Sequence, residues 1–292
     1  MVSGMAIAFA LACLACSVGN EITVKFFARK IRSRGDFVTV VGMTWLALLL
    51  GIALASEAGG GADACATWRW GLASGFFSVA SNILLIEAMG KQSAGLCVTI
   101  FRLNLALVVL GAWLLLGESI SPRQWAGVFC AVAAMAAFWP AAGNIRIHGD
   151  ARAAKLGFAL AVAASLLRAG MGLGYKYGLD QGADAQGILI LSASCWVAGG
   201  LLYSRARERR WFSADRKTWR YGMVSGALCL GITYAMAQGL RHGAASVVLS
   251  VAQMSFLGTF ILSAWLLGES FTARRGLGLA GGIACILLMA SG

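Results

Sequence analysis

The sequence predicts an all-α membrane protein whose ten transmembrane helices form two inverted five-helix repeats around a central cavity. Two observations predict this fold. The 292 residues are 59% hydrophobic and 12% charged, with a mean hydropathy of +0.77, which is more apolar surface than a soluble core can bury. The stretch LLLGES at 114–119 also returns 151 positions later as WLLGES at 265–270, so the chain contains an internal repeat.

The repeat extends well beyond these six residues. The same offset of 151 aligns Lys25 with Lys176 and the run 69–71 (RWG) with the run 220–222 (RYG). We therefore expect residues 1–143 and 152–292 to be two copies of one unit, with the same number of elements in each copy.

Ten apolar runs are long enough to cross a bilayer as helices, which takes about 20 residues. In chain order they cover residues 4–27, 37–55, 70–89, 93–116, 122–142, 154–177, 186–203, 221–240, 244–267 and 273–291. The strands of a membrane barrel are only about ten residues long and alternate in polarity, which excludes that class. The run 4–27 lacks the basic start of a secretory signal, so we expect it to be the first span.

Helix boundaries around the repeated motif follow from its residues. The Gly-Glu-Ser elements break the fourth and ninth spans, and Ser121-Pro122 and Thr272 then provide the residues typical of a helix start. Glu118 and Glu269 are interpreted as structural, because an acid near a helix N-terminus favours the helix dipole.

The distribution of basic residues predicts the orientation. Five spans per repeat place the second copy upside down relative to the first. Seventeen Lys and Arg residues lie in the connections after odd-numbered spans and three lie on the other side, which predicts an inner-membrane protein with both termini facing outward. The net charge of +12 is then explained by topology and anionic lipid headgroups, without a nucleic-acid partner.

Other features exclude several functional classes. The eight cysteines lie almost entirely in predicted spans, and the C-x-x-C at 13–16 has no second pair and no nearby histidine, so we interpret them as packing residues. The G-x-G-x-x-G at 276–281 follows no strand and is interpreted as helix packing. Scattered acids do not form the clustered site of a membrane enzyme. We expect no catalytic residue, metal or cofactor, and a monomer whose partners are a small-molecule substrate and the bilayer.

Polar side chains inside the spans are costly in lipid and mark candidate functional positions. Arg102 and Asn104 lie near the centre of the fourth span, Gln253 and Ser255 occupy the same positions in the ninth, and Arg168 lies near the centre of the sixth. The remaining candidates are Asn82, Tyr234 and Lys176 as substrate contacts, and Glu21, Lys25 and Glu87 as coupling or gating groups. The spans 37–55, 122–142, 186–203 and 273–291 are almost apolar at mid-depth, so the other six should enclose the cavity.

Two interpretations of the buried arginines stay open. A guanidinium keeps its charge in an apolar environment, so Arg102 and Arg168 would form an attractive site for a carboxylate or phosphate. Alternatively, Arg102 pairs with Glu87 and Glu21 pairs with Lys25, which would make these groups structural.

In each five-span repeat, the fourth span ends in an apolar run that is followed by Gly-Glu and then by a Ser-Pro or Thr-Ala helix start. This arrangement resembles the EamA domain of the drug/metabolite transporter superfamily. The resemblance covers essentially the whole chain and implies secondary transport by alternating access through a central cavity. Many members carry a Glu-Pro pair near the position of Arg102-Leu103, which this chain lacks. We expect transport of an anionic or zwitterionic metabolite such as an amino acid. The alternative is a flippase or transporter for a lipid-linked or phosphorylated sugar.

Overall fold

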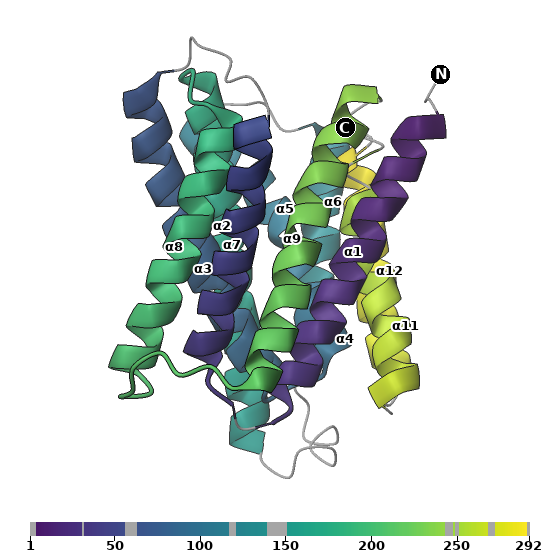
Figure 1. The fold of residues 1–292 in the computed structure, drawn as a ribbon. Helices are drawn as coiled ribbons and strands as arrows, with labels where there is room; N and C mark the ends of the chain where they lie inside the picture. The colour runs from purple at the N-terminus through teal and green to yellow at the C-terminus, as the bar shows by residue number, and fades with distance from the viewer. Residues whose placement is uncertain are drawn as a thin grey trace.

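The computed structural model describes residues 4–30, 32–55, 63–116, 121–138, 151–242, 248, 251–267 and 272–290. Over these ranges the chain is a bundle of helices that run roughly parallel or antiparallel to one another (Figure 1). The helices are α1 (Gly4–Ala28), α2 (Arg34–Ala55), α3 (Ala64–Met89), α4 (Ala94–Arg102), α5 (Asn104–Leu116), α6 (Pro122–Phe138), α7 (Ala151–Asp180), α8 (Ala185–Ala206), α9 (Arg216–His242), α11 (Ser255–Leu267) and α12 (Ala273–Ala290). Glu118 and Glu269 lie outside the described residues.

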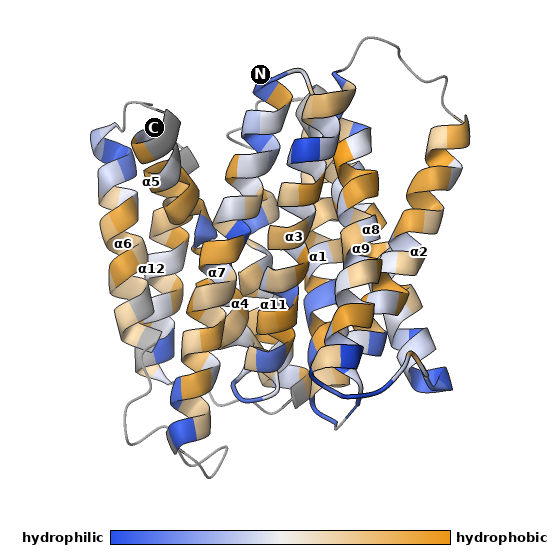
Figure 2. Cartoon of the chain, turned by 90° about the vertical axis from the view of Figure 1, so that its left-hand side faces the viewer, coloured by the Kyte–Doolittle hydropathy of each residue, from blue (hydrophilic) through white to orange (hydrophobic). Residues whose placement is uncertain are grey.

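Hydrophobic residues make up most of the length of the helices, and many of the most hydrophilic residues lie toward the helix ends (Figure 2). Among the described residues, six segments are long and apolar enough to span a membrane, namely α1, α2, α3, Ala94–Gly111, Arg152–Asp180 and α8. Val251–Leu266 and Arg275–Leu288 are shorter apolar helices. The chain is therefore a multi-pass membrane protein, while the number of ten crossings stays a prediction.

The two ends of the bundle differ in charge. The first residues of α1 and the last residues of α12 lie at one end, and the segment 207–215 between α8 and α9 lies at the other (Figure 1). That segment carries Arg207, Arg209 and Arg210, and the turn after α1 carries Arg29 and Lys30. We call this end of the bundle the basic side.

The predicted helix starts after the repeated motif are confirmed. Ser121 Oγ accepts a hydrogen bond of 3.2 Å from the backbone N–H of Gln124, whose side chain accepts one of 2.8 Å from the Ser121 N–H. In the second half, Thr272 Oγ1 accepts a hydrogen bond of 3.3 Å from the backbone N–H of Arg275. These caps satisfy amide groups that have no partner within the first turn of a helix.

The internal repeat is visible in the helix boundaries. Helices α2 and α8 begin at Arg34 and Ala185, and α5 and α11 begin at Asn104 and Ser255, so both pairs keep the offset of 151 seen in the sequence. The predicted continuous helix over 93–116 is wrong in one respect, because it is divided at Leu103, between α4 and α5. There the Leu103 N–H is shared between Thr99 O and Ile100 O, each at 3.2 Å, as in a tightened helical turn.

The same break occurs in the second half. The N–H of Met254, 151 positions after Leu103, bonds to the carbonyl oxygen of Val251 at 3.1 Å, three residues back, directly before α11 begins. Both broken helices lie beside polar residues that the sequence singles out, Arg102 and Gln253. Interrupted helices inside a membrane protein are tolerated where they border a cavity.

Helices of the first half pack against helices of the second. The pairs in contact include α1 with α9, α3 with α7, α2 with α8, α3 with α8, α2 with α9, α4 with α11, and α6 with α12. At the crossing of α2 and α8, a Cβ on Gly42 would lie 2.7 Å from the backbone nitrogen of Val197, and a Cβ on Gly200 would lie 2.5 Å from that of Thr39. Glycine is therefore required where these backbones approach most closely.

The prediction that the cysteines pack as small apolar side chains is confirmed for three of them, whereas Cys65 is exposed. All eight are free thiols, and Cys13, Cys97 and Cys285 are buried. Cys13 and Cys97 lie in two different apolar clusters of the bundle, and Cys285 lies in a third that includes Leu103.

Candidate functional site

A cavity of about 100 Å³ lies among α1, α2, α3, α4, α7, α8 and α9. Its polar wall contains the three charged side chains Glu21, Arg102 and Arg168. The remaining lining residues are Ser17, Asn20, Trp45, Ser78, Asn82, Leu85, Phe101, Trp196, Cys229, Ile232 and Thr233. A cavity of this size with polar walls has room for several water molecules.

Two helices that the sequence assigns to an outer supporting role contribute to this wall. Trp45 of α2 and Trp196 of α8 meet edge to face with ring centroids 6.1 Å apart, and the Trp196 indole N–H donates to Ser78 Oγ at 3.0 Å. The expectation that the spans 37–55 and 186–203 stay outside the cavity is therefore wrong. The physical reason is that a tryptophan, although mostly apolar, carries an indole N–H that needs a polar partner when it is buried.

Arg102 and Glu21 form the central ion pair. Arg102 Nη2 lies 2.6 Å from Glu21 Oε1, and Arg102 Nη1 donates to Gln253 Oε1 at 3.0 Å. The Glu21 carboxylate also accepts hydrogen bonds from Ser255 Oγ at 3.3 Å and from the Thr259 hydroxyl. The structure thus joins α1, α4 and the α11 region in one polar network, and the proposed pairing of Arg102 with Glu87 is wrong.

Arg168 enters the cavity from α7 without such a partner. Its guanidinium carbon lies 5.7 Å from the centroid of the Phe101 ring, a cation–π contact. Within the part of the chain that the structure describes, Arg168 has no hydrogen-bond or ion-pair partner. Its charge is therefore directed at the cavity and available to a ligand.

The other predicted substrate contacts divide into two groups. Asn82 lines the cavity and donates to Ser78 O at 2.9 Å, while Gln253 and Ser255 act through Arg102 and Glu21.

Asn104, Lys176 and Tyr234 do not line the cavity. Asn104 is the half-buried first residue of α5, Lys176 is exposed near the end of α7, and Tyr234 is 53% exposed on α9. Thr233 lines the cavity in place of Tyr234, because successive helix residues point about 100° apart.

Lys25 and Glu87 lie between the cavity and the basic side. Lys25 Nζ is buried and donates to the backbone oxygens of Met89 at 2.8 Å and Gln92 at 2.5 Å, which closes the turn between α3 and α4 against α1. Glu87 accepts a hydrogen bond of 2.6 Å from the Tyr203 hydroxyl and forms an ion pair with Arg34. These contacts join α1, α2, α3 and α8 below the cavity.

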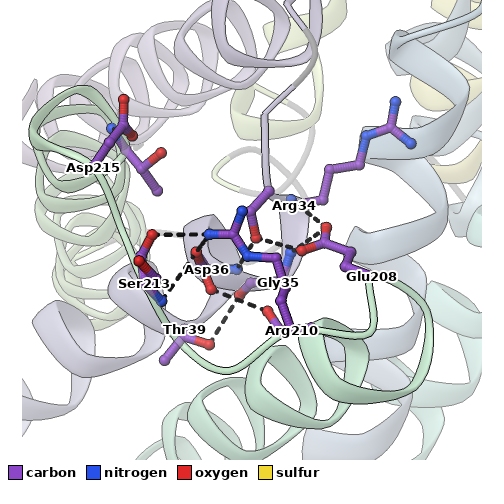
Figure 3. A network of polar contacts seen from close by, with 11 residues as sticks. Arg34, Gly35, Asp36, Thr39, Glu208, Arg210, Ser213 and Asp215 are labelled. Carbon is purple, nitrogen blue, oxygen red and sulfur yellow. Dashed lines mark hydrogen bonds and ion pairs between the residues drawn. The ribbon is translucent and has the colours of Figure 1, made fainter.

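A second polar network continues this closure at the surface. Figure 3 shows Asp36, at the start of α2, surrounded by groups from α8 and the segment after it. Its carboxylate pairs with Arg210 and accepts from Ser204 Oγ at 3.1 Å, while Glu208 accepts from the backbone N–H groups of Arg34 at 2.8 Å and Gly35 at 3.3 Å. The segment 207–215 is thereby held against the start of α2.

Several contributors to the site were not identified from the sequence. Thr259 lies four residues after Ser255, so both hydroxyls share one helix face and reach Glu21. Asn20, which accepts a hydrogen bond of 2.5 Å from Ser225 Oγ of α9, lines the cavity beside Glu21. The i, i+4 spacing was the available signal for Thr259, whereas the link from α1 to α9 depends on tertiary packing.

Comparison with known proteins adds one family relationship. The model of the EamA-like transporter family matches the sequence twice, over residues 4–139 and 155–291. A search of curated proteins finds no match. Among solved structures, one crystal structure matches the whole length of both chains with 13% sequence identity and a TM-score of 0.64, a likeness that supports the fold alone.

Proposed function

Because the chain belongs to the EamA-like transporter family, we propose that it carries a small anionic or zwitterionic metabolite, such as an amino acid, across the inner membrane by alternating access. The observation that carries this proposal is Arg168, a cavity-lining guanidinium without an acidic partner among the described residues. The family accounts for transport of small molecules, and the charge of the cavity accounts for the class of substrate.

The charge balance of the cavity favours an anion. Its wall contains two arginines and one glutamate, and the glutamate is already paired with Arg102. One positive charge is therefore left uncompensated in a region of low dielectric constant, where a charge gains most from a counterion. A substrate carboxylate bound to Arg168 would supply this counterion, and a guanidinium can bind both carboxylate oxygens at once.

The size of the cavity supports a mechanism with at least two conformations. At about 100 Å³ it is smaller than the roughly 300–1,000 Å³ of typical ligand pockets, so binding a metabolite requires the surrounding helices to separate. The contacts of Lys25 and the ion pair of Arg34 with Glu87 lie on the basic side of the cavity. In the proposed cycle these contacts break when the cavity opens toward that side.

The arrangement of the two halves supports inversion of the repeats. The offset of 151 makes α7 the counterpart of α1, and α9 the counterpart of α3. Replacing each helix by its counterpart turns the contact of α1 with α9 into the contact of α7 with α3, and both contacts are present, as a twofold axis requires. The pairs α2 with α8 and α6 with α12 are unchanged by the exchange, and the pair α1 with α11 exchanges with α7 with α5. Inverted repeats of this kind allow one arrangement of contacts to close either side in turn.

The proposal is tested in liposomes. A thermal-shift screen over amino acids, phosphosugars and quaternary amines identifies a stabilising ligand, and counterflow of that ligand is then measured for the wild type, Arg168→Ala and Arg168→Lys. We expect Arg168→Ala to abolish counterflow and Arg168→Lys to retain part of it, because lysine keeps the charge and loses the bidentate geometry. Unchanged counterflow in a folded Arg168→Ala variant would remove this residue from the substrate site.

A further inference from the structure

A larger cavity lies apart from the central site, where α1 and α9 meet at the basic side. Its volume is about 750 Å³. We call it the basic niche and define it by its five basic lining residues, Arg29, Lys30, Arg32, Lys217 and Arg220. The remaining lining residues are Thr23, Phe26, Tyr221 and Val224.

Most of the charge in the basic niche is uncompensated. In the described part of the chain, Arg29, Lys30, Lys217 and Arg220 form no ion pair. Arg32 lies with its guanidinium carbon 5.1 Å from the centroid of the Tyr221 ring, and its Nη1 atom is buried without a hydrogen-bond partner. The niche thus presents several cationic donors, one of them buried, to a single ligand.

Asp215 offsets only part of this charge. Asp215 lies close to Arg32 and accepts a hydrogen bond of 2.8 Å from the backbone N–H of Thr218 in the first turn of α9. Its hydrogen bonds to Thr218 hold the pKa of Asp215 below its usual range, so this carboxylate stays ionised at neutral pH. One negative charge beside five basic side chains leaves the niche strongly positive.

The walls of the niche change from charged to apolar along the helix axes. Arg29 and Lys30 lie in the turn after α1, which carries Phe26, and Lys217 and Arg220 precede Val224 on α9. Both apolar residues therefore lie nearer the middle of the bundle. Val224 is 51% exposed. Basic residues at the helix ends can contact the headgroup of a phospholipid, and the apolar residues nearer the middle of the bundle can contact its acyl chains. A soluble anion would contact the basic residues alone.

The counterpart pair of helices, α3 and α7, forms an equivalent niche with much less charge. Between α3 and α7, a cavity of about 590 Å³ is lined by Arg69, Trp70, Ala73, Tyr177 and Gln181, among others. The offset of 151 matches these positions to Arg220, Tyr221, Val224, Phe26 and Lys30. This second niche contains one basic residue, whereas the basic niche contains five. The high positive charge is therefore confined to the niche on the basic side.

We propose that the basic niche binds the phosphate group of an anionic phospholipid from the leaflet on the basic side, with an acyl chain against Phe26 and Val224. This inference goes beyond the proposed function, since the niche shares no lining residue with the central cavity. Its neighbour, an opening of about 530 Å³, shares Arg29, Lys30 and Arg32 but not Lys217 or Arg220. Substitutions of Lys217 and Arg220 therefore test the basic niche without changing the lining of the neighbouring opening.

The test is native mass spectrometry of the purified full chain, incubated with mixed micelles of phosphatidylglycerol and phosphatidylcholine. A basic residue near an anionic headgroup contributes about 1 kcal/mol, about a fivefold change in affinity, so Lys217→Gln/Arg220→Gln should weaken phosphatidylglycerol retention roughly thirtyfold. The control Arg207→Gln/Arg209→Gln removes the same charge from exposed positions outside the niche and should change retention little.

Three outcomes would overturn the proposal. The first is equal retention of the two lipids by the wild type. The second is an equal loss in the two double variants, which would show a general effect of net charge. The third is displacement of phosphatidylglycerol by inorganic phosphate at similar concentration, which would identify a soluble anion as the ligand. Thermal unfolding of each variant confirms that it is folded, and failure of any arm leaves the transport proposal standing.

Discussion

Removal of the Glu21 carboxylate is the sharpest test of the central polar network. In the wild type, Glu21 receives hydrogen bonds from Arg102, Ser255 and Thr259, and the Glu21 and Arg102 side chains are only 7% and 16% exposed. Glu21→Ala leaves a buried guanidinium without its counterion, which typically costs about 3–5 kcal/mol. Glu21→Ala/Arg102→Met removes both charges together and should recover a large part of that loss, because it leaves no unpaired charge in the network.

The free energy of unfolding of the wild type, Glu21→Ala, Arg102→Met and the double variant is measured by detergent-induced unfolding in mixed micelles. The four values form a double-mutant cycle whose coupling term reports the ion pair. We expect the double variant to be more stable than Glu21→Ala. A cost below about 1 kcal/mol for Glu21→Ala, the range of exposed ion pairs, or additive costs for the two substitutions would contradict the geometry described above.

Three further predictions concern packing, the basic side and topology. Gly42→Ala should destabilise the protein by about 1–3 kcal/mol, since its Cβ would meet the backbone of α8 at 2.7 Å. Gly51→Ala, with open space around position 51, should leave the stability unchanged or raise it by up to about 1 kcal/mol. Thermal melts that rank the two variants in the other order would contradict the α2–α8 crossing. Asp36→Ala should cost about 1–3 kcal/mol because it leaves several donors unpaired. Arg210→Ala should cost a similar amount, because it leaves the Asp36 carboxylate, which is only 1% exposed, without its counterion; both are measured by the same unfolding assay. Cys65 is exposed in the first turn of α3, whose other end contacts Lys25 near the basic side, so Cys65 lies at the opposite end. It should react with an impermeant maleimide added to intact cells, and reaction only after permeabilisation would reverse the predicted orientation.

The sequence predicts the repeat and most of its helices because both depend on local patterns. Apolar runs define the spans, and the offset that aligns the LLLGES and WLLGES motifs also aligns α2 with α8 and α5 with α11. The breaks at Leu103 and Met254 could not be predicted in the same way, because neither position carries a proline or glycine. They occur where the two helices border the polar network, a feature of the assembled bundle.

The residues of the site were easier to predict than their partners. Arg102, Arg168 and Glu21 stand out as charges inside apolar runs, and all three line the cavity. Which acid pairs with Arg102 depends on how α1 packs beside α4 and α11, and sequence proximity favoured Glu87, which Arg34 and Tyr203 engage instead. Side-chain pairing across distant helices leaves no local pattern in the sequence.

The central claim is that Arg168 supplies the charge that binds the transported anion. Its most direct test is the dissociation constant of the identified ligand, measured by titration calorimetry for the wild type, Arg168→Gln and the exposed control Arg207→Gln. Hydrogen bonds to a charged group contribute about 1.5–3 kcal/mol, so Arg168→Gln should weaken binding roughly 10- to 150-fold while the control binds as the wild type does. Equal affinity in the wild type and Arg168→Gln would contradict the account.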